Sequence, residues 1–314
     1  VGMSYTNKYD AAEDVDGDDV YNIHEYWFGS DPWISDNTST GTAVREAISS
    51  VDSQLVGRTP SVALPIFTIQ NHGSTNYVRN TNCWAYTYDL TCNSPWNSAG
   101  GIYYTGTLIS PRHVLFAAHW DDVTNGTVMR FVDQQNNVVE RKIVAKKRHP
   151  LYKPYYPDIS VGLLNSDVPT NQISYAKVMP DDYGEYLHTG NRLPALWLNQ
   201  WHRAQVGDVI NIVNVNPSNE KHCTLTEPQD ATRHLYYQNP LGELGPTGGD
   251  SGNPVFLLLS GEPILLTVWT HGYPSDSGTA ISSFKQDINN LMQELGGGYQ
   301  LTEYDMSGFR KIRD

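Results

Sequence analysis

From about residue 61 onward the sequence is a series of short apolar runs separated by turn residues, and this pattern limits the chain to few folds. The runs SVALPIFTI, GIYYTGTLIS, VLFAA and ISVGLLN are rich in β-branched and aromatic residues. Turn pairs such as Asn125-Gly126 and Ser260-Gly261 separate the runs. Many short strands with few helices predict an all-β barrel or sandwich, and the lack of a repeating period argues against a propeller.

Helical patterns occur only near the two ends of this β-rich region. The segment AVREAISSVDSQL predicts a short helix before it. In ISSFKQDINNLMQEL the apolar residues recur at helical spacing, and Gly296 follows as a stop signal. We therefore divide the chain into an acidic extension (1–45), a linker or short helix (46–60), a β-domain (61–298) and a polar surface tail (299–314).

The negative charge is concentrated at the start of the chain. The first 40 residues hold nine acidic residues and one lysine, a net −8 of the −13 carried by all 314 residues. The remainder is only mildly acidic and has no phosphate-binding pattern, so we expect no nucleic-acid partner. No apolar run approaches the length of a membrane span. The sequence opens without a charged-then-apolar leader, so we expect no signal peptide within it.

Three cysteines are too few for a disulfide framework. Cys83 and Cys92 flank CWAYTYDLTC, an alternating segment that would bring them together if it folded as a hairpin. The sequence leaves open whether they are bridged or free. We expect Cys223 to be a small buried side chain, and without a CxxC pair the sequence predicts no cysteine zinc site.

The acidic extension contains the twelve-residue stretch DVDGDDVYNIHE. Oxygen ligands at positions 1, 3, 5, 7, 9 and 12 of such a loop suit a hard cation such as calcium. The stretch resembles the loops of EF-hands, dockerins and thrombospondin type 3 repeats, although Asp19 stands where glycine is usual and Gly17 would supply the turn. The resemblance implies a structural calcium site and a possible docking or tethering role, and the alternative is a solvated acidic tail. The expected ligands are Asp14, Asp16, Asp18, the Val20 carbonyl, Asn22 and Glu25.

Three segments of the β-domain carry residue types that work together in nucleophilic catalysis. A serine hydroxyl needs a neighbouring base, and the base needs a group that orients it. Ser251 lies in the glycine-rich stretch GPTGGDSGNPVF, and His119 ends the apolar run VLFAAH. Asp158 stands directly before the apolar run 159–164, where its carboxylate needs a polar partner. An imidazole is a suitable partner, so these three residues are candidates for one site.

The stretches GTLISPRHVLFAAHW, RHPLYKPYYPDISVGLL and GGDSGNPVF, in this order, resemble the histidine, aspartate and serine motifs of the chymotrypsin/trypsin-like serine proteases. The resemblance implies a double six-stranded β-barrel with a C-terminal helix, and a secreted endopeptidase acting on proteins or peptides. It implies that His119 is the general base, Asp158 the orienting acid and Ser251 the nucleophile. The backbone N–H groups of Gly249 and Ser251 would form the oxyanion hole.

The chain departs from the family pattern around this site. Trp120 stands where the family has a cysteine, and its usual partner position is Tyr104, so we predict an aromatic contact in place of that disulfide. Asn253 replaces a glycine, which we expect activity to tolerate. In animal relatives the residue matching Asp250 pairs with a new N-terminus made by cleavage. No such start exists here, which leaves a basic residue such as Arg58, or a zymogen state, as explanations.

The resemblance also suggests a specificity pocket. Gly245 would form its floor, so no acidic residue stands there to select lysine or arginine. The expected pocket is open and prefers a large apolar or aromatic residue. His271 supports an alternative preference for glutamate, and a non-catalytic protein that docks through its N-terminal repeat is the other alternative. The remaining pocket residues would be Thr270, which commonly supports the aspartate, His271 on the wall, Gly272 at the entrance and Gly278 opposite.

Overall fold

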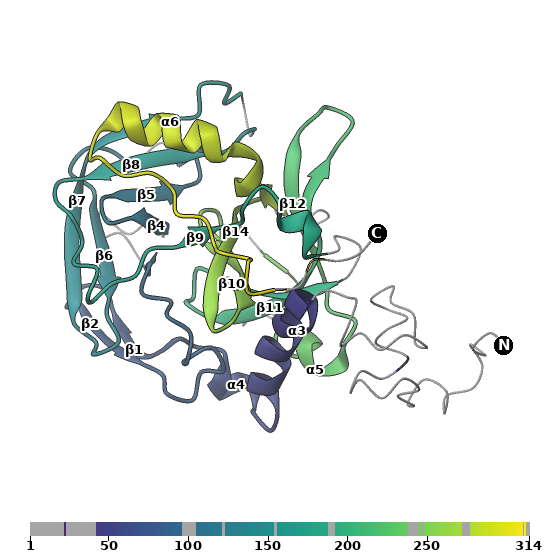
Figure 1. Ribbon diagram of the computed structural model, residues 1–314. Helices are drawn as coiled ribbons and strands as arrows, with labels where there is room; N and C mark the ends of the chain where they lie inside the picture. The colour runs from purple at the N-terminus through teal and green to yellow at the C-terminus, as the bar shows by residue number, and fades with distance from the viewer. Residues whose placement is uncertain are drawn as a thin grey trace.

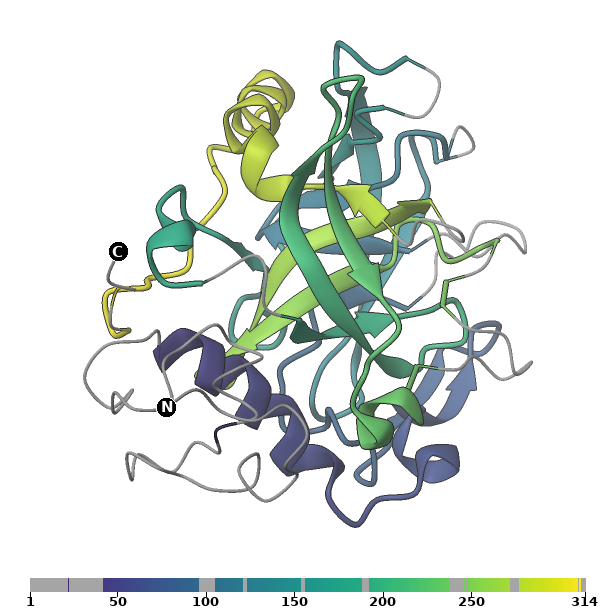
Figure 2. The ribbon, with the colours of Figure 1, turned by 90° about the vertical axis from the view of Figure 1, so that its right-hand side faces the viewer.

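The strands of the protein form two large sheets that lie side by side (Figures 1 and 2). A separate hairpin consists of β1 (Phe67–Asn71) and β2 (Asn76–Arg79). The computed structural model describes residue 22 and residues 42–95, 105–120, 123–153, 156–187, 192–237, 245–246, 248–271, 277–309 and 311.

The first sheet has six strands, and all its neighbouring strands are antiparallel. In β7, Val139 and Ile143 are buried while Glu140 and Lys142 are exposed, so the strand has one inward and one outward face. The strands in sheet order are β3 (Asn93–Ser94), β4 (Gly106–Ser110), β5 (His113–Phe116), β8 (Ser160–Leu164), β7 (Val138–Arg148) and β6 (Val128–Val132).

The second sheet closes on itself, because its first strand also pairs with β14. The closed ring has six strands, and a short seventh strand, β9 (Lys177–Val178), adds to β14 in parallel. The predicted double six-stranded barrel is therefore confirmed, with β9 as an addition. The ring runs through β13 (Pro254–Leu259), β10 (Leu193–Leu198), β11 (Ala204–Val215), β12 (Lys221–Thr226), β15 (Ser277–Thr279) and β14 (Glu262–His271).

Helix α3 (Thr42–Leu55) covers β10 and β13 on the outside of the second barrel, which explains why both strands are buried on both faces. Its buried residues Ala43, Ala47 and Val51 recur every four positions and form one face. This confirms the helix predicted before the β-domain. The short helix α4 (Pro60–Ala63) lies between α3 and β1, and two further short helices, η1 (Tyr183–Glu185) and α5 (Ala231–His234), lie in connections between strands.

The predicted C-terminal helix is present, and its first turn is a 3-10 helix. The turn η2 (Ile281–Phe284) leads into α6 (Lys285–Leu295), which lies on β7 and β8 of the first barrel (Figure 1). Gly296 ends the helix with a φ of +87°, and its N–H bonds to the carbonyls of Met292 and Gln293.

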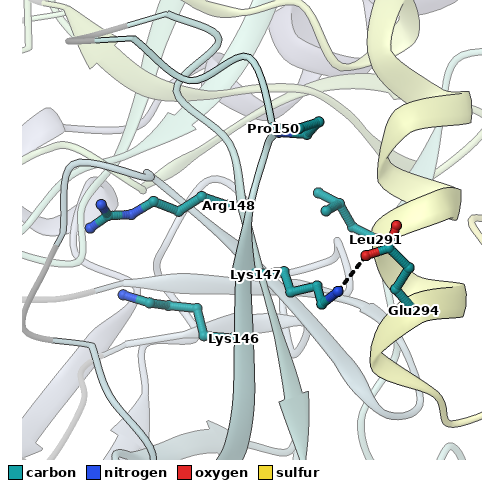
Figure 3. A pocket seen from close by; sticks show the side chains of 6 residues that line it. All are labelled: Lys146, Lys147, Arg148, Pro150, Leu291 and Glu294. Carbon is teal, nitrogen blue, oxygen red and sulfur yellow. Dashed lines mark hydrogen bonds and ion pairs between the residues drawn. The ribbon is translucent and has the colours of Figure 1, made fainter.

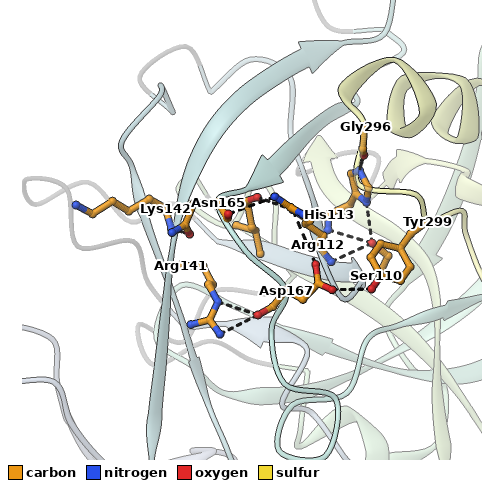
Figure 4. A network of polar contacts seen from close by, with 10 residues as sticks. Ser110, Arg112, His113, Arg141, Lys142, Asn165, Asp167, Gly296 and Tyr299 are labelled. Atoms are coloured by element: carbon orange, nitrogen blue, oxygen red, sulfur yellow. Dashed lines mark hydrogen bonds and ion pairs between the residues drawn. The ribbon is translucent and has the colours of Figure 1, made fainter.

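A polar network fixes the end of α6 to the first barrel (Figure 4). The Nε2–H of buried His113 donates to the carbonyl of Gly296 (2.8 Å), while its Nδ1 accepts from the hydroxyl of Ser110 (2.7 Å). The Tyr299 hydroxyl donates to Asp167 (2.7 Å), on the same side of the barrel. Burial lowers the pKa of His113, so its ring is neutral at pH 7 and keeps these roles.

The prediction of a polar surface tail after the helix is wrong for its central part. Tyr304 and Met306 are buried in the core of the second barrel. The backbone of this segment bonds to β9, because Val178 donates to Thr302 (3.0 Å) and accepts from Tyr304 (2.9 Å). Because this backbone pairing holds the segment against the second barrel, the alternate residues Tyr304 and Met306 pack into its core.

The three cysteines are free and buried. The segment between Cys83 and Cys92 does not form a hairpin but runs through successive turns, such as the bonds from Tyr86 to Cys83 and from Tyr88 to Ala85. The pattern of alternation was therefore misleading. Burial raises the pKa of Cys83 to about 12 and also raises the pKa values of the other two thiols, so all three stay protonated at neutral pH.

Among the described residues, no helix has the length and apolar character that crossing a membrane requires.

Candidate active site

Strand pairing in the first barrel brings His119 and Asp158 together. Phe116, the last residue of β5, pairs directly with Ser160, the first residue of β8. His119 follows β5 by three residues, and Asp158 precedes β8 by two. Because the strands are antiparallel, both side chains emerge at the same end of the sheet.

Asp158 is fully buried and accepts two hydrogen bonds from His119. The backbone N–H of His119 donates to Oδ1 (2.9 Å), and its Nδ1 lies 2.5 Å from Oδ2. An ionised carboxylate only accepts, so neutral His119 carries its proton on Nδ1 and leaves Nε2 unprotonated. The buried charge thus has the partner that it requires, and the imidazole has the tautomer of a general base.

A chain of two threonines supports Asp158 from the second barrel. The Asp158 backbone N–H donates to the Thr279 hydroxyl (3.1 Å), and the Thr267 hydroxyl donates to the Thr279 carbonyl (2.8 Å). The sequence assigned a supporting hydroxyl to Thr270, and the structure adds Thr279, whose hydroxyl accepts the Asp158 backbone N–H. Thr279 lies 121 residues away in sequence, and the pairing of β15 with both β12 and β14 positions it.

Gly278 keeps this part of the second barrel tightly packed. A Cβ atom at this position would lie 2.1 Å from the Val268 carbonyl oxygen and 2.3 Å from the Thr267 hydroxyl. Backbone atoms of a neighbouring strand cannot move away easily, so the requirement for glycine here is steric.

Gly278→Ala is expected to lower the free energy of unfolding by about 2–4 kcal/mol, because the added methyl group displaces β14. Gly184→Ala is the matched control, since nothing lies within 4 Å of a Cβ atom there, and it should change stability by less than about 0.5 kcal/mol. Urea unfolding measures both. Equal stability of the two variants would contradict this account.

The turn that carries Ser251 is fixed by side chains that the sequence did not reveal. The backbone N–H of Gln200 donates to Asp250 (2.9 Å), and the Gln200 side-chain amide donates to the Gly248 carbonyl (2.9 Å). Asn253, fully buried, bonds to the Asp250 carbonyl through both its backbone N–H and its side-chain amide (3.0 Å each). Asn253 therefore helps to hold the turn in place, whereas from the sequence we expected only that activity tolerates it.

Arg58, the basic residue suggested by the sequence, does not pair with Asp250. Asp250 is buried, and its carboxylate accepts the Gln200 N–H. Arg58 instead donates to the carbonyl of Asn82 (3.0 Å). Gln200 belongs to the connection between β10 and β11, so this contact to Asp250 comes from the second barrel.

Trp120 connects the turn at Ser251 to His119. The Trp120 ring centroid lies 4.9 Å from that of His119, and its indole N–H donates to the Ser251 carbonyl (3.1 Å). His119 and Ser251 are both described, and they form no direct hydrogen bond with each other. The predicted partner of Trp120, Tyr104, lies outside the described residues.

The predicted oxyanion hole consists of two backbone N–H groups. Within the described part of the chain, neither the Gly249 N–H nor the Ser251 N–H donates to a protein group. Gly249 has a φ of +103°, a conformation that side chains with a Cβ atom rarely adopt.

The other predicted site residues are only partly described. Gly245 is buried and Thr270 is half-buried, while Gly272 and the side chain of His271 lie outside the described residues. Asn22 is buried, and the other expected calcium ligands, Asp14, Asp16, Asp18, Val20 and Glu25, also lie outside the described residues. The calcium loop and the pocket preference therefore stay predictions from the sequence.

No protein-family model matches this chain, and no curated protein is significantly similar to it.

Proposed function

We propose that this protein is a serine endopeptidase that hydrolyses peptide bonds through an acyl-enzyme intermediate. The observation that carries the proposal is the buried Asp158 carboxylate bonded to Nδ1 of His119, with Trp120 linking this pair to the turn at Ser251. A fully buried carboxylate that orients an imidazole is the arrangement that a general base requires. The two-barrel fold is consistent with the family that the three motifs resemble.

In the proposed reaction, Nε2 of His119 takes the proton of the Ser251 hydroxyl as Oγ attacks the peptide carbonyl carbon. The carbonyl oxygen becomes an oxyanion, which accepts from the N–H groups of Gly249 and Ser251. The tetrahedral species collapses, and His119 gives its proton to the leaving amine. A water molecule then attacks the acyl ester in the same way, which releases the carboxylic acid and restores Ser251.

We further propose that a large apolar or aromatic residue precedes the cleaved bond. The support is the glycine at position 245, where a carboxylate would select basic residues. Cleavage profiles on a diverse peptide library test this preference, and preferred cleavage after glutamate would replace it with the alternative that His271 suggests.

Covalent labelling tests the activity. An organophosphonate probe carrying a fluorophore should attach to the folded chain at a single residue, Ser251, located by mass spectrometry of the digested protein. The same chain unfolded in urea should not react, because the reactivity depends on His119. A folded chain without an adduct, or with the adduct on another serine, would overturn the proposal in favour of a non-catalytic binding protein.

A further inference from the structure

The indole of Trp120 lies between two residues that must act together. Its ring contacts the imidazole of His119 at 4.9 Å between centroids, with an angle of 39° between the planes. Its N–H donates to the Ser251 carbonyl at 3.1 Å. His119 follows a strand of the first barrel, whereas Ser251 precedes β13 of the second, so one side chain connects the two barrels at the site.

The turn at Ser251 is shaped to receive this indole. Gly252 has a φ of +82°, and a Cβ atom there would lie 3.2 Å from the Trp120 indole nitrogen and 2.9 Å from the Thr105 carbonyl oxygen. The Gly252 N–H donates to the Trp269 carbonyl (2.8 Å). The glycine therefore allows the close approach between turn and indole, while β14 holds the turn through its backbone.

The backbone of Trp120 is fixed to the first barrel. Its carbonyl accepts from the ammonium group of Lys146 (3.3 Å), and its N–H lies 3.3 Å from the Ala117 carbonyl. Figure 3 shows Lys146 pointing away from α6, whereas the neighbouring Lys147 points towards Glu294 on that helix. The ammonium group of Lys146 also lies 5.9 Å from the centre of the ring of Phe116, the last residue of β5. Trp120 is thus held at its backbone by one barrel and at its indole by the other.

We propose that Trp120 is a positioning residue that holds the Ser251 turn at a fixed distance from His119; this role rests on the proposed function. The indole bond sets the position of the Ser251 backbone, and the ring limits rotation of the imidazole. A displacement of about 1 Å between reacting groups can lower a rate about 100-fold. A single bond across the barrel interface therefore has a larger effect on rate than on stability.

The test compares three variants of the full chain. Trp120→Phe keeps a ring beside His119 but loses the N–H, and Trp120→Leu loses both. Trp84→Phe is the matched control, because buried Trp84 also donates its indole N–H to a backbone carbonyl, that of Ala204 (2.7 Å). The maximal rate of labelling at Ser251 is expected to fall about 10-fold for Trp120→Phe and about 100-fold for Trp120→Leu. The probe concentration giving half that rate should change less than about twofold, and Trp84→Phe should label at the wild-type rate.

Several outcomes would overturn the inference. Labelling of Trp120→Phe at the wild-type rate would show that the indole bond does not position Ser251. Equal losses in Trp120→Phe and Trp84→Phe, with equal shifts in their urea midpoints, would reduce Trp120 to a stabilising residue. If the wild-type chain is labelled and Trp120→Phe is labelled at the same rate, the positioning role alone is refuted. If the wild-type chain is not labelled at all, the proposed function is refuted.

Discussion

Replacing Asp158 by asparagine is expected to lower the turnover number about 10⁴-fold at neutral pH while the fold remains intact. The asparagine amide can donate to Nδ1 of His119, which favours the tautomer with its proton on Nε2. That tautomer cannot take the Ser251 proton, and no buried negative charge remains to stabilise the imidazolium. Steady-state hydrolysis of a peptide substrate measures the loss.

Two further variants serve as controls for this result, one with a larger expected loss and one with none. Ser251→Ala should lose about 10⁶-fold in turnover, because no nucleophile remains. Asp167→Asn changes a half-exposed carboxylate that binds Tyr299 on the side of the barrel near α6, and its turnover should equal that of the wild type. If Asp158→Asn retained more than about a tenth of wild-type turnover, the pairing with His119 would not be catalytic.

Acid is expected to destabilise the protein through His202. This side chain is buried next to His72, with 5.3 Å between ring centroids, and neither of its ring nitrogens has a hydrogen-bond partner among the described residues. Burial, with a smaller contribution from His72, lowers the pKa of His202 to about 3 from its ordinary value of 6.5. The unfolded chain binds a proton below pH 6.5 that the folded chain cannot bind. The free energy of unfolding should therefore fall by up to ~5 kcal/mol as the pH falls from 6.5 to 3.

Asp208 acts in the opposite direction. Burial raises its pKa to about 6 from 3.8, although Arg233 lies 3.5 Å away. The folded chain then binds the proton more readily than the unfolded chain, which adds up to ~3 kcal/mol of stability as the pH falls from 6 to 3.8. The contributions of His202 and Asp208 to the free energy of unfolding therefore partly cancel as the pH falls.

The variant His202→Asn separates the pH-dependent contribution of His202 to stability from that of Asp208. Asparagine does not titrate and tolerates the left-handed backbone at this position, where φ is +56°. Its loss of packing should lower stability by a similar amount at every pH, so the difference from wild type in urea unfolding isolates the proton binding. Wild-type and variant profiles that stay parallel between pH 6.5 and pH 4 would contradict the role of His202.

The sequence was sufficient for features that depend on local pattern. Most strand runs, the helix before the β-domain and the stop at Gly296 follow from spacing within a few residues. The run SVALPIFTI is an exception, because its first residues belong to helix α4 and only its end lies in β1. The end of β5 and the start of β8 were also visible, which is why His119 and Asp158 could be paired before their contact was known.

Features that depend on distant contacts were missed. Thr279 meets Asp158 across 121 residues, Gln200 meets Asp250 across 50 and the indole of Trp120 meets Ser251 across 131. No local signal distinguishes these residues from other polar or aromatic residues near strand ends. The buried Tyr304 was missed for a related reason, since the apolar residues of 299–314 are irregularly spaced among polar ones and give no periodicity from which burial can be inferred.

The order of synthesis gives the segment 285–309 a further consequence. Met292 belongs to the core that includes the first barrel, and Tyr304 belongs to the core of the second. Both are made after every strand of the two sheets. Domains begin to fold during translation as they emerge, but neither core here is complete until this segment follows. We therefore expect both barrels to reach their final packing only after this segment has been made.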